Sequence, residues 1–257
     1  MSVQSSLSNA KEKVMVDYCF LSLRGSYEVN EDSVGFVNNP QRQCFILADG
    51  LGGHGKGDVA SAAAVQYAQQ FLSTCTVLDR NAIEQCFNGV HAMLEQIRSK
   101  EHSARGIKTT MVLLIIENSV AYWAHVGDSR LYRFNRFKVV EQTKDHSVPQ
   151  MMVMMGEITE KQIRGNPDRN KLLRALGMDG DPPRVEVHFP GTPVRKGDSF
   201  LLCSDGFWEL IDESQMQKSL IFSRTAADWL DKMKTTVETN GRNVKMDNYS
   251  AITVKIV

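Results

Sequence analysis

Two apolar, strand-like runs in this chain end abruptly in an Asp-Gly pair. The first run, CFILADGLGGHGKG, contains Asp49, and the second, SFLLCSDGFWEL, contains Asp205. Each run delivers a carboxylate to the end of an element, and the glycine that follows allows a tight turn. Asp247 precedes the terminal apolar run YSAITVKIV in a similar way. Acidic residues repeated at strand ends predict that the strands converge on one point, where a metal ion binds.

The composition is that of an ordinary globular protein. Of the 257 residues, 42% are hydrophobic and 23% are charged. Lys+Arg and Asp+Glu both number 30, so the net charge of zero gives no support for binding to nucleic acid or to an acidic membrane surface. The longest apolar run, 111–116, is too short to span a bilayer, and the polar N-terminus lacks the apolar core of a signal peptide. We expect a soluble, cytoplasmic monomer.

Residue patterns predict clustered strands with helices grouped between them. Runs of β-branched and aromatic residues predict strands, and apolar residues at helical spacing predict three helices, the second of which begins at Asp79 or Asn81. This grouping favours one α+β domain over alternating βαβ units. The predicted strands are 14–23, 43–48, 109–117, 119–126, 184–189, 199–203 and 250–257, with a hairpin of 131–134 and 137–142, and the helices lie around 60–72, 83–97 and 226–237.

Residues 143–180 break this pattern. The stretch is polar, contains several glycines and has four methionines between positions 151 and 155. We expect short helices in a surface excursion, the kind of segment that often shapes a binding site. Residues 1–13 are expected to form a disordered tail, which leaves a single domain at 14–257.

The candidate metal ligands are carboxylates at the ends of predicted strands. Taken singly, each has an ordinary alternative, because Asp-Gly is a common turn dipeptide and Gly127-Asp128 can close a hairpin. Taken together, buried carboxylates without matching lysines or arginines need a counter-cation. The donors are oxygens only, without His or Cys pairs at zinc spacing, which favours Mg²⁺ or Mn²⁺. The set consists of Glu31, Asp32, Asp49, Asp128, Asp205 and Asp247.

Eight segments in order resemble one known family. They are VNEDS, LADGLGGHGKG, TTMVLLII, AHVGDSRLYRF, TKDHS, LLRALG, LLCSDGFWEL and DNYSAITV. The chain resembles, from about Val14 to Val257, the bacterial branch of the PPM (type 2C) family of metal-dependent Ser/Thr protein phosphatases. The resemblance implies a four-layer αββα sandwich of two antiparallel sheets flanked by helix pairs. It also implies a metal site in the cleft at one end of the sandwich and makes 143–180 a flap subdomain.

The resemblance assigns a role to each candidate ligand. Asp49 would bridge two Mn²⁺ or Mg²⁺ ions, with Asp205 and Asp247 holding the first ion and the carbonyl of Gly50 binding the second. Glu31 and Asp32 would anchor the water shell of the second ion, and Asp128 would share a third, weaker ion with Asp205. The implied reaction is hydrolysis of phosphoserine or phosphothreonine in proteins by a metal-bridging hydroxide. The implied partners are phosphorylated proteins and a pathway with a cognate Ser/Thr kinase.

The chain departs from the family at one position. Five residues before Asp32, the family has an arginine that is expected to bind the substrate phosphate. Tyr27 stands there. Arg24 and His54 are the candidates for contact with the phosphate, although an arginine ahead of a turn is often solvated and His54 can instead stabilise its loop. Two alternatives stay open at this point. Tyr27 motivates a catalytically weak, phosphatase-like binding or regulatory module, and the acidic turns alone would also suit a non-catalytic, calcium-stabilised structural protein.

Overall fold

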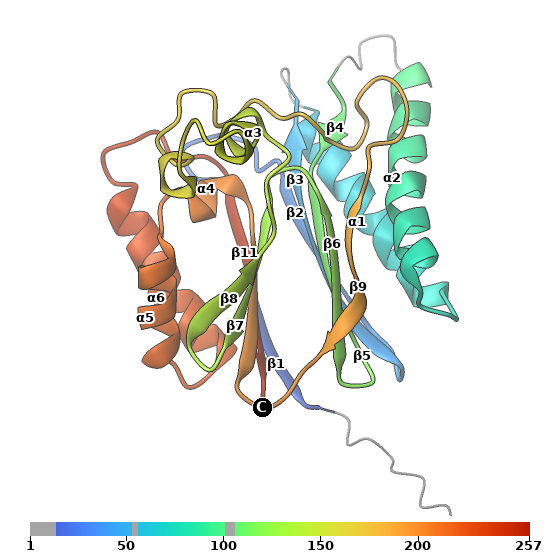
Figure 1. The fold of residues 1–257 in the computed structure, drawn as a ribbon. Coiled ribbons are helices and arrows are strands. Elements are labelled where there is room, and N and C mark those ends of the chain that lie inside the picture. The colour runs from blue at the N-terminus through green and yellow to red at the C-terminus, as the bar shows by residue number, and fades with distance from the viewer. Residues whose placement is uncertain (1–13, 53–55, 101–105) are drawn as a thin grey trace, which may run out of the picture.

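The computed structural model describes residues 14–52, 56–100 and 106–257, and in this part of the chain the strands form two antiparallel sheets that face each other (Figure 1). The predicted tail at 1–13 lies outside the described residues. One sheet has the order β1 (Val16–Leu23), β11 (Tyr249–Ile256), β10 (Asp198–Cys203), β7 (Arg130–Asn135) and β8 (Lys138–Gln142). The other has the order β2 (Asp32–Asn38), β3 (Arg42–Leu51), β5 (Met111–Glu117), β6 (Val120–Val126) and β9 (Glu186–Pro193), with β4 (Lys108–Thr109) paired to β3.

Helices cover the outer face of each sheet. Figure 1 shows α1 (Gly57–Thr74) and α2 (Arg80–Lys100) on one side of the sandwich, and α5 (Glu213–Ile221) and α6 (Ala226–Asn240) on the other. The shorter α3 (Val148–Met154), the 3₁₀ turn η1 (Glu160–Gln162) and α4 (Asp205–Trp208) complete the helical elements of the described chain. The predicted four-layer αββα sandwich is confirmed.

The continuous apolar run of β5 follows from burial on both faces of its sheet. Side chains alternate along a strand, so Leu113 and Ile115 pack under α1 and α2. Val112 and Leu114 point the other way, into the layer between the two sheets. A strand that is buried on both sides needs apolar residues at every position. The same reasoning applies to β3, where alternate residues enter the same two cores.

Most predicted elements are confirmed, with shifts of a few residues at their ends. Asp79 is the N-cap of α2, since its Oδ1 accepts the N–H of Ala82 at 2.7 Å. Our prediction missed β2 and α5. In β2 the alternation is interrupted by Gly35, where an added Cβ would lie 2.4 Å from Val65 of α1. None of the helices within the described ranges has both the length and the apolar character needed to cross a membrane.

Candidate metal centre

The predicted carboxylates come together at the end of the sandwich where several strands begin or end. Asp49 lies near the end of β3 and faces Asp32, the first residue of β2, in the antiparallel register. Asp205 begins α4 just after β10 ends. On the neighbouring strands, Asp128 precedes β7 and Asp247 precedes β11. Pairing within each sheet and packing of the two sheets thus bring residues in or beside five strands to one end of the sandwich.

A cavity of about 510 Å³ opens over this cluster. Asp32 faces the lining residue Asp49 but does not itself line the cavity, and it is buried, with 6% of its surface exposed. Asn170 and Leu172, from the predicted flap segment, form another part of the wall. Gly50 adds its backbone to the lining, and Glu28 adds a carboxylate that was not among the predicted ligands. In all, six carboxylates line the cavity, and these are Glu28, Glu31, Asp49, Asp128, Asp205 and Asp247.

The carboxylates raise one another's affinity for protons. Burial, followed by the charge of Asp205, raises the pKa of Asp49 well above its usual value. Burial also raises the pKa of Asp205 strongly, with Asp128 as the largest charged contributor. The pKa of Asp128 rises to about 7, first through burial and then through Asp145. Burial raises the pKa of Asp32 to about 6, against the hydrogen bond from Ser204. Such a cluster favours any cation that can bind in it.

The described residues provide no cationic side chain inside this cavity. The nearby Arg130 is paired with Asp145, at 2.7 Å between Nη2 and Oδ2, and its effect on Asp128 is outweighed by that of Asp145. Asp32 Oδ1 is buried without a hydrogen-bond partner. A buried carboxylate oxygen in that state is costly. The donor set therefore fits hard, oxygen-preferring divalent cations.

Neutral side chains hold the carboxylates in place. Ser204 Oγ donates to Asp32 Oδ2 at 2.7 Å and accepts the N–H of Ser250 at 2.9 Å. Asn248 Oδ1 accepts the N–H of Glu31 at 2.8 Å, while its Nδ2 donates to the carbonyl of Arg24 at 2.8 Å. These supporting residues were not among the predicted site residues. The sequence marks them by position, because Ser204 directly precedes Asp205 and Asn248 directly follows Asp247.

A second support acts on Asp128. Trp208 of α4 donates its Nε1–H to the carbonyl of Asp128 at 3.0 Å. The guanidinium carbon of Arg130 lies 3.4 Å from the centroid of the Trp208 ring, and Arg130 makes two hydrogen bonds to Asp145. This buried group fixes the backbone on which Asp128 is carried.

The two candidates for phosphate contact are placed differently from the carboxylates. Arg24 is exposed and does not line the cavity, whereas Tyr27 does. His54 lies outside the described residues. A role for Arg24 or His54 in phosphate binding stays a prediction.

Another group of possible ligands, His125, His146 and Glu186, does not have the chemistry of a metal site. His146 Nδ1 accepts the N–H of Gly127 at 3.1 Å, so the neutral ring carries its proton on Nε2, which faces Glu186 Oε1 at 3.7 Å. A protonated ring nitrogen has no lone pair for a metal. Burial lowers the pKa of His146 to about 3, which keeps the ring neutral. The trio is therefore a structural support.

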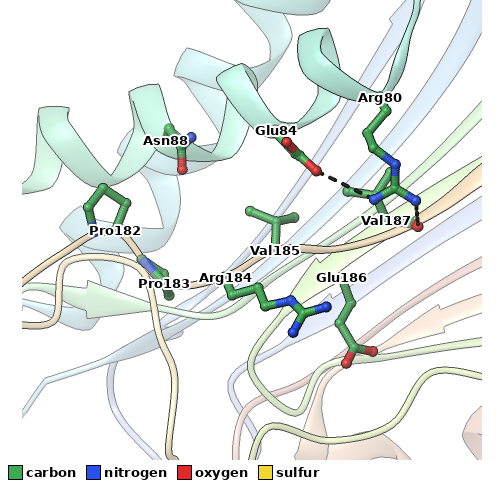
Figure 2. Close-up of a pocket in the computed structure, with 9 residues that line it drawn as sticks. All are labelled: Arg80, Glu84, Asn88, Pro182, Pro183, Arg184, Val185, Glu186 and Val187. Atoms are coloured by element: carbon green, nitrogen blue, oxygen red, sulfur yellow. Dashed lines mark hydrogen bonds and ion pairs between the residues drawn. The ribbon is translucent and has the colours of Figure 1, made fainter.

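A further hollow, of about 470 Å³, lies between α2 and the segment that leads into β9 (Figure 2). Arg80 donates to Glu84 at 3.4 Å and to the carbonyl of Val187 at 3.1 Å, as the dashed lines in Figure 2 show. Arg184 and Glu186 add one charge of each sign. Arg80 thus occupies carbonyl groups at the edge of β9, which protects the edge from pairing with another strand.

Known proteins are similar to this chain over most of its length. A family model described as protein phosphatase 2C matches residues 22–249. The serine/threonine phosphatase Stp of Listeria monocytogenes is 33% identical over 232 residues, which are 88% of this chain and 90% of that protein.

Solved structures share the fold. Phosphatase Stp1 of Staphylococcus aureus has a TM-score of 0.84 at 25% identity, over 95% of this chain and 96% of that chain. The catalytic domain of the phosphatase PstP, solved in complex with two manganese ions, has a TM-score of 0.77 at 24% identity, over 94% of this chain and 98% of that chain. The family model and the relative from Listeria, which is bacterial as the sequence motifs suggested, show that this chain belongs to the protein phosphatase 2C (PPM) family of protein serine/threonine phosphatases.

Proposed function

We propose that this chain hydrolyses phosphoserine and phosphothreonine in proteins at a centre of two Mn²⁺ or Mg²⁺ ions. The observation that carries the proposal is a cavity lined by six carboxylates and, within the described residues, by no cationic side chain. Carboxylates gathered in this way need a cation, and no side chain that lines this cavity supplies one. Their oxygen-only chemistry selects a hard divalent ion.

The residues divide into those that would bind ions and those that would position ligands. Asp49 would lie between the two ions, Asp205 and Asp247 would hold the first, and the carbonyl of Gly50 would bind the second. Glu31 and Asp32 would act through the water shell of the second ion, and Asp128 with Asp205 would hold a third. When bound, the two ions would supply a bridging hydroxide as the nucleophile and would neutralise charge on the phosphoryl oxygens.

The backbone near the ligands suits this arrangement. A Cβ at Gly50 would lie 2.0 Å from the carbonyl oxygen of Gly57 and 2.7 Å from that of Glu31. Only glycine therefore allows the end of β3 to approach both segments. Gly50 also donates its N–H to the carbonyl of Glu31 at 3.0 Å, which joins two proposed ligand segments directly.

The alternative of a catalytically weak regulatory module rests on Tyr27. This side chain, 41% exposed, lines the cavity where the family resemblance leads us to expect an arginine. The complete carboxylate set favours the enzyme, since a degenerate member would not need all of these acids. The substrate proteins, a cognate Ser/Thr kinase, the cytoplasmic location and the monomeric state stay predictions.

The test is hydrolysis of a phosphothreonine peptide with Mn²⁺, Mg²⁺, Ca²⁺ or EDTA. We expect turnover with Mn²⁺ or Mg²⁺ that EDTA abolishes and that Ca²⁺ does not support. Asp205→Asn should lose activity by orders of magnitude while its circular dichroism is retained. Asp231→Asn, at an exposed position on α6, is the matched control and should behave as wild type. Full turnover by folded Asp205→Asn would refute the metal assignment.

A further inference from the structure

A second cavity, of about 280 Å³, adjoins the carboxylate cavity and contains cations. The two cavities share Tyr27, Asn170, Asp205 and Asp247 as lining residues. A substrate phosphate bound next to Asp205 and Asp247 would therefore also face the second cavity. Its cationic lining residues are Arg164, Arg169 and Lys245.

The two arginines are already engaged with carboxylates. Arg164 Nη2 lies 2.7 Å from Glu213 Oε1, and Arg164 also donates to the carbonyls of Trp208 and Ile211. Arg169 Nε lies 2.7 Å from Glu209 Oε1. For either guanidinium to bind a phosphate through all of its donors, its ion pair with the glutamate would have to break.

Lys245 differs from both arginines. Its Nζ lies 4.1 Å from the centroid of the Tyr27 ring, and it forms no ion pair with any carboxylate in the described part of the chain. A cation over an exposed aromatic ring is held only weakly. The ammonium group is thus oriented by Tyr27 and keeps its full charge for another anion.

The backbone fixes Lys245 close to the proposed ligands. Ser26 donates its N–H to the carbonyl of Met246 at 3.0 Å, and Ser26 Oγ accepts the N–H of Met246 at 3.0 Å. Gly25 has a φ of +56°, and a Cβ there would lie 2.1 Å from the carbonyl oxygen of Asp247. The loop that carries Tyr27 is therefore locked against the loop that carries Lys245 and Asp247.

We propose that Lys245, held over the ring of Tyr27, binds the phosphoryl oxygens of the substrate. It would supply the positive charge that the family resemblance leads us to expect from an arginine at position 27. An ammonium group offers three donors to phosphate oxygens as a point charge. The inference rests on the proposed function, because the phosphate would also lie against the ions held by Asp205 and Asp247.

The test compares Lys245→Met with wild type, both loaded with Mn²⁺. Hydrogen bonds to charged groups are strong enough that we expect an increase of about tenfold in three quantities. These are the KM for a phosphothreonine peptide, the KM for a small aryl phosphate and the inhibition constant of inorganic phosphate. Calorimetry of inorganic phosphate binding gives a readout that does not depend on turnover. Lys234→Met, whose lysine pairs with Glu238 on α6, is the matched control and should leave all of them unchanged.

Two further variants test the role of the ring. Tyr27→Phe keeps an aromatic face and should bind phosphate as wild type does, whereas Tyr27→Leu should weaken binding. Arg24→Ala is made in parallel, because Arg24 is the competing candidate. Unchanged phosphate binding in Lys245→Met would overturn the inference, as would an effect confined to the peptide. Turnover of the wild-type protein with Mn²⁺ tests the proposed function separately. If the wild type turns over and Lys245→Met binds phosphate equally well, the role of Lys245 is refuted and the proposed function stands.

Discussion

Ser204 shows how one small side chain can hold a charged site together. Its hydroxyl joins Asp32 at the start of β2 to the N–H of Ser250 in β11, across the two sheets. The other carboxylate oxygen of Asp32 is buried without a partner. Ser204 therefore supplies the side-chain hydroxyl that stabilises Asp32 in its ionised form, and it holds Asp32 opposite Asp49, which lines the cavity that the ions would occupy.

Ser204→Ala should weaken both the fold and metal binding. At pH 8 the carboxylate of Asp32 is ionised, since its pKa is about 6, and loss of its hydrogen bond should lower the free energy of unfolding by about 1–3 kcal/mol. Urea unfolding in EDTA measures this loss, and titration with Mn²⁺ measures the affinity. Ser214→Ala, which removes an exposed hydroxyl bonded to Asp212, should change neither quantity. A wild-type Mn²⁺ affinity in Ser204→Ala would contradict the role given to Asp32.

At the scale of elements, a buried ion pair connects β7, the segment after β8 and α4. Arg130 begins β7 and is 2% exposed, and Asp145 is 5% exposed. Trp208 of α4 stacks against this pair and binds the carbonyl of Asp128. Removal of one partner of a buried pair costs far more than the pair itself contributes, because the remaining charge is left uncompensated.

Arg130→Met should therefore destabilise the protein by about 3–5 kcal/mol, as measured by urea unfolding. Lys234→Met removes an exposed ion pair with Glu238 and should cost less than about 1 kcal/mol. If the charge left on Asp145 is the cause, Arg130→Met/Asp145→Leu should recover part of the loss. A double variant as unstable as the single one would place the effect in the stacking on Trp208 instead.

The elements differ in how readily the sequence predicts them. β3 and β5 are buried on both faces, so their unbroken apolar runs identified them. β2 was missed because Gly35 interrupts its alternation where the strand approaches α1. α5 was missed although Asp212 and Gln215 form a capping box at its start, a signal that is present in the sequence.

The supporting contacts of the site could not be predicted in the same way. The carboxylates follow apolar runs, which is a local pattern. In contrast, Asn248 binds the N–H of Glu31 across 217 positions of the chain, and Ser204 binds Asp32 across 172. Contacts of this kind depend on how the two sheets are packed against each other, and no local spacing encodes them.

At the scale of the whole molecule, the sandwich is built around a repulsive cluster at one end. The packed cores between and outside the sheets hold the strand ends together, and the carboxylates at those ends oppose this. The raised pKa values of Asp32, Asp49, Asp128 and Asp205 express the conflict. Without metal, the folded protein keeps protons on these acids that the unfolded chain releases near pH 4.

This conflict predicts how stability changes with pH when metal is removed. Because the folded state holds the extra protons, its free energy of unfolding falls as pH rises from about 4 through the folded pKa values, which are about 6 for Asp32 and about 7 for Asp128. His125 and His146 act in the opposite direction, since burial lowers their pKa values and the unfolded histidines release their protons around pH 6.5. This contribution is nearly complete by about pH 7.5. Above that pH the acids dominate, chiefly Asp49 and Asp205, whose pKa values are raised most strongly.

In EDTA, the Tm of wild type should fall by several degrees between about pH 7.5 and 8.5, whereas Mn²⁺ should raise the Tm most at the upper end of this range, where it replaces protons already lost. Asp128→Asn removes one of the opposed charges and retains both histidines. It should therefore be more stable than wild type in EDTA at pH 8 and show a flatter pH dependence, while it gains less from Mn²⁺. A wild-type Tm that rises with pH in EDTA, or an Asp128→Asn variant with an unchanged slope, would mean that the cluster does not oppose folding. The metal would then bind to carboxylates that do not destabilise the fold, and the sandwich would not need its positive charge.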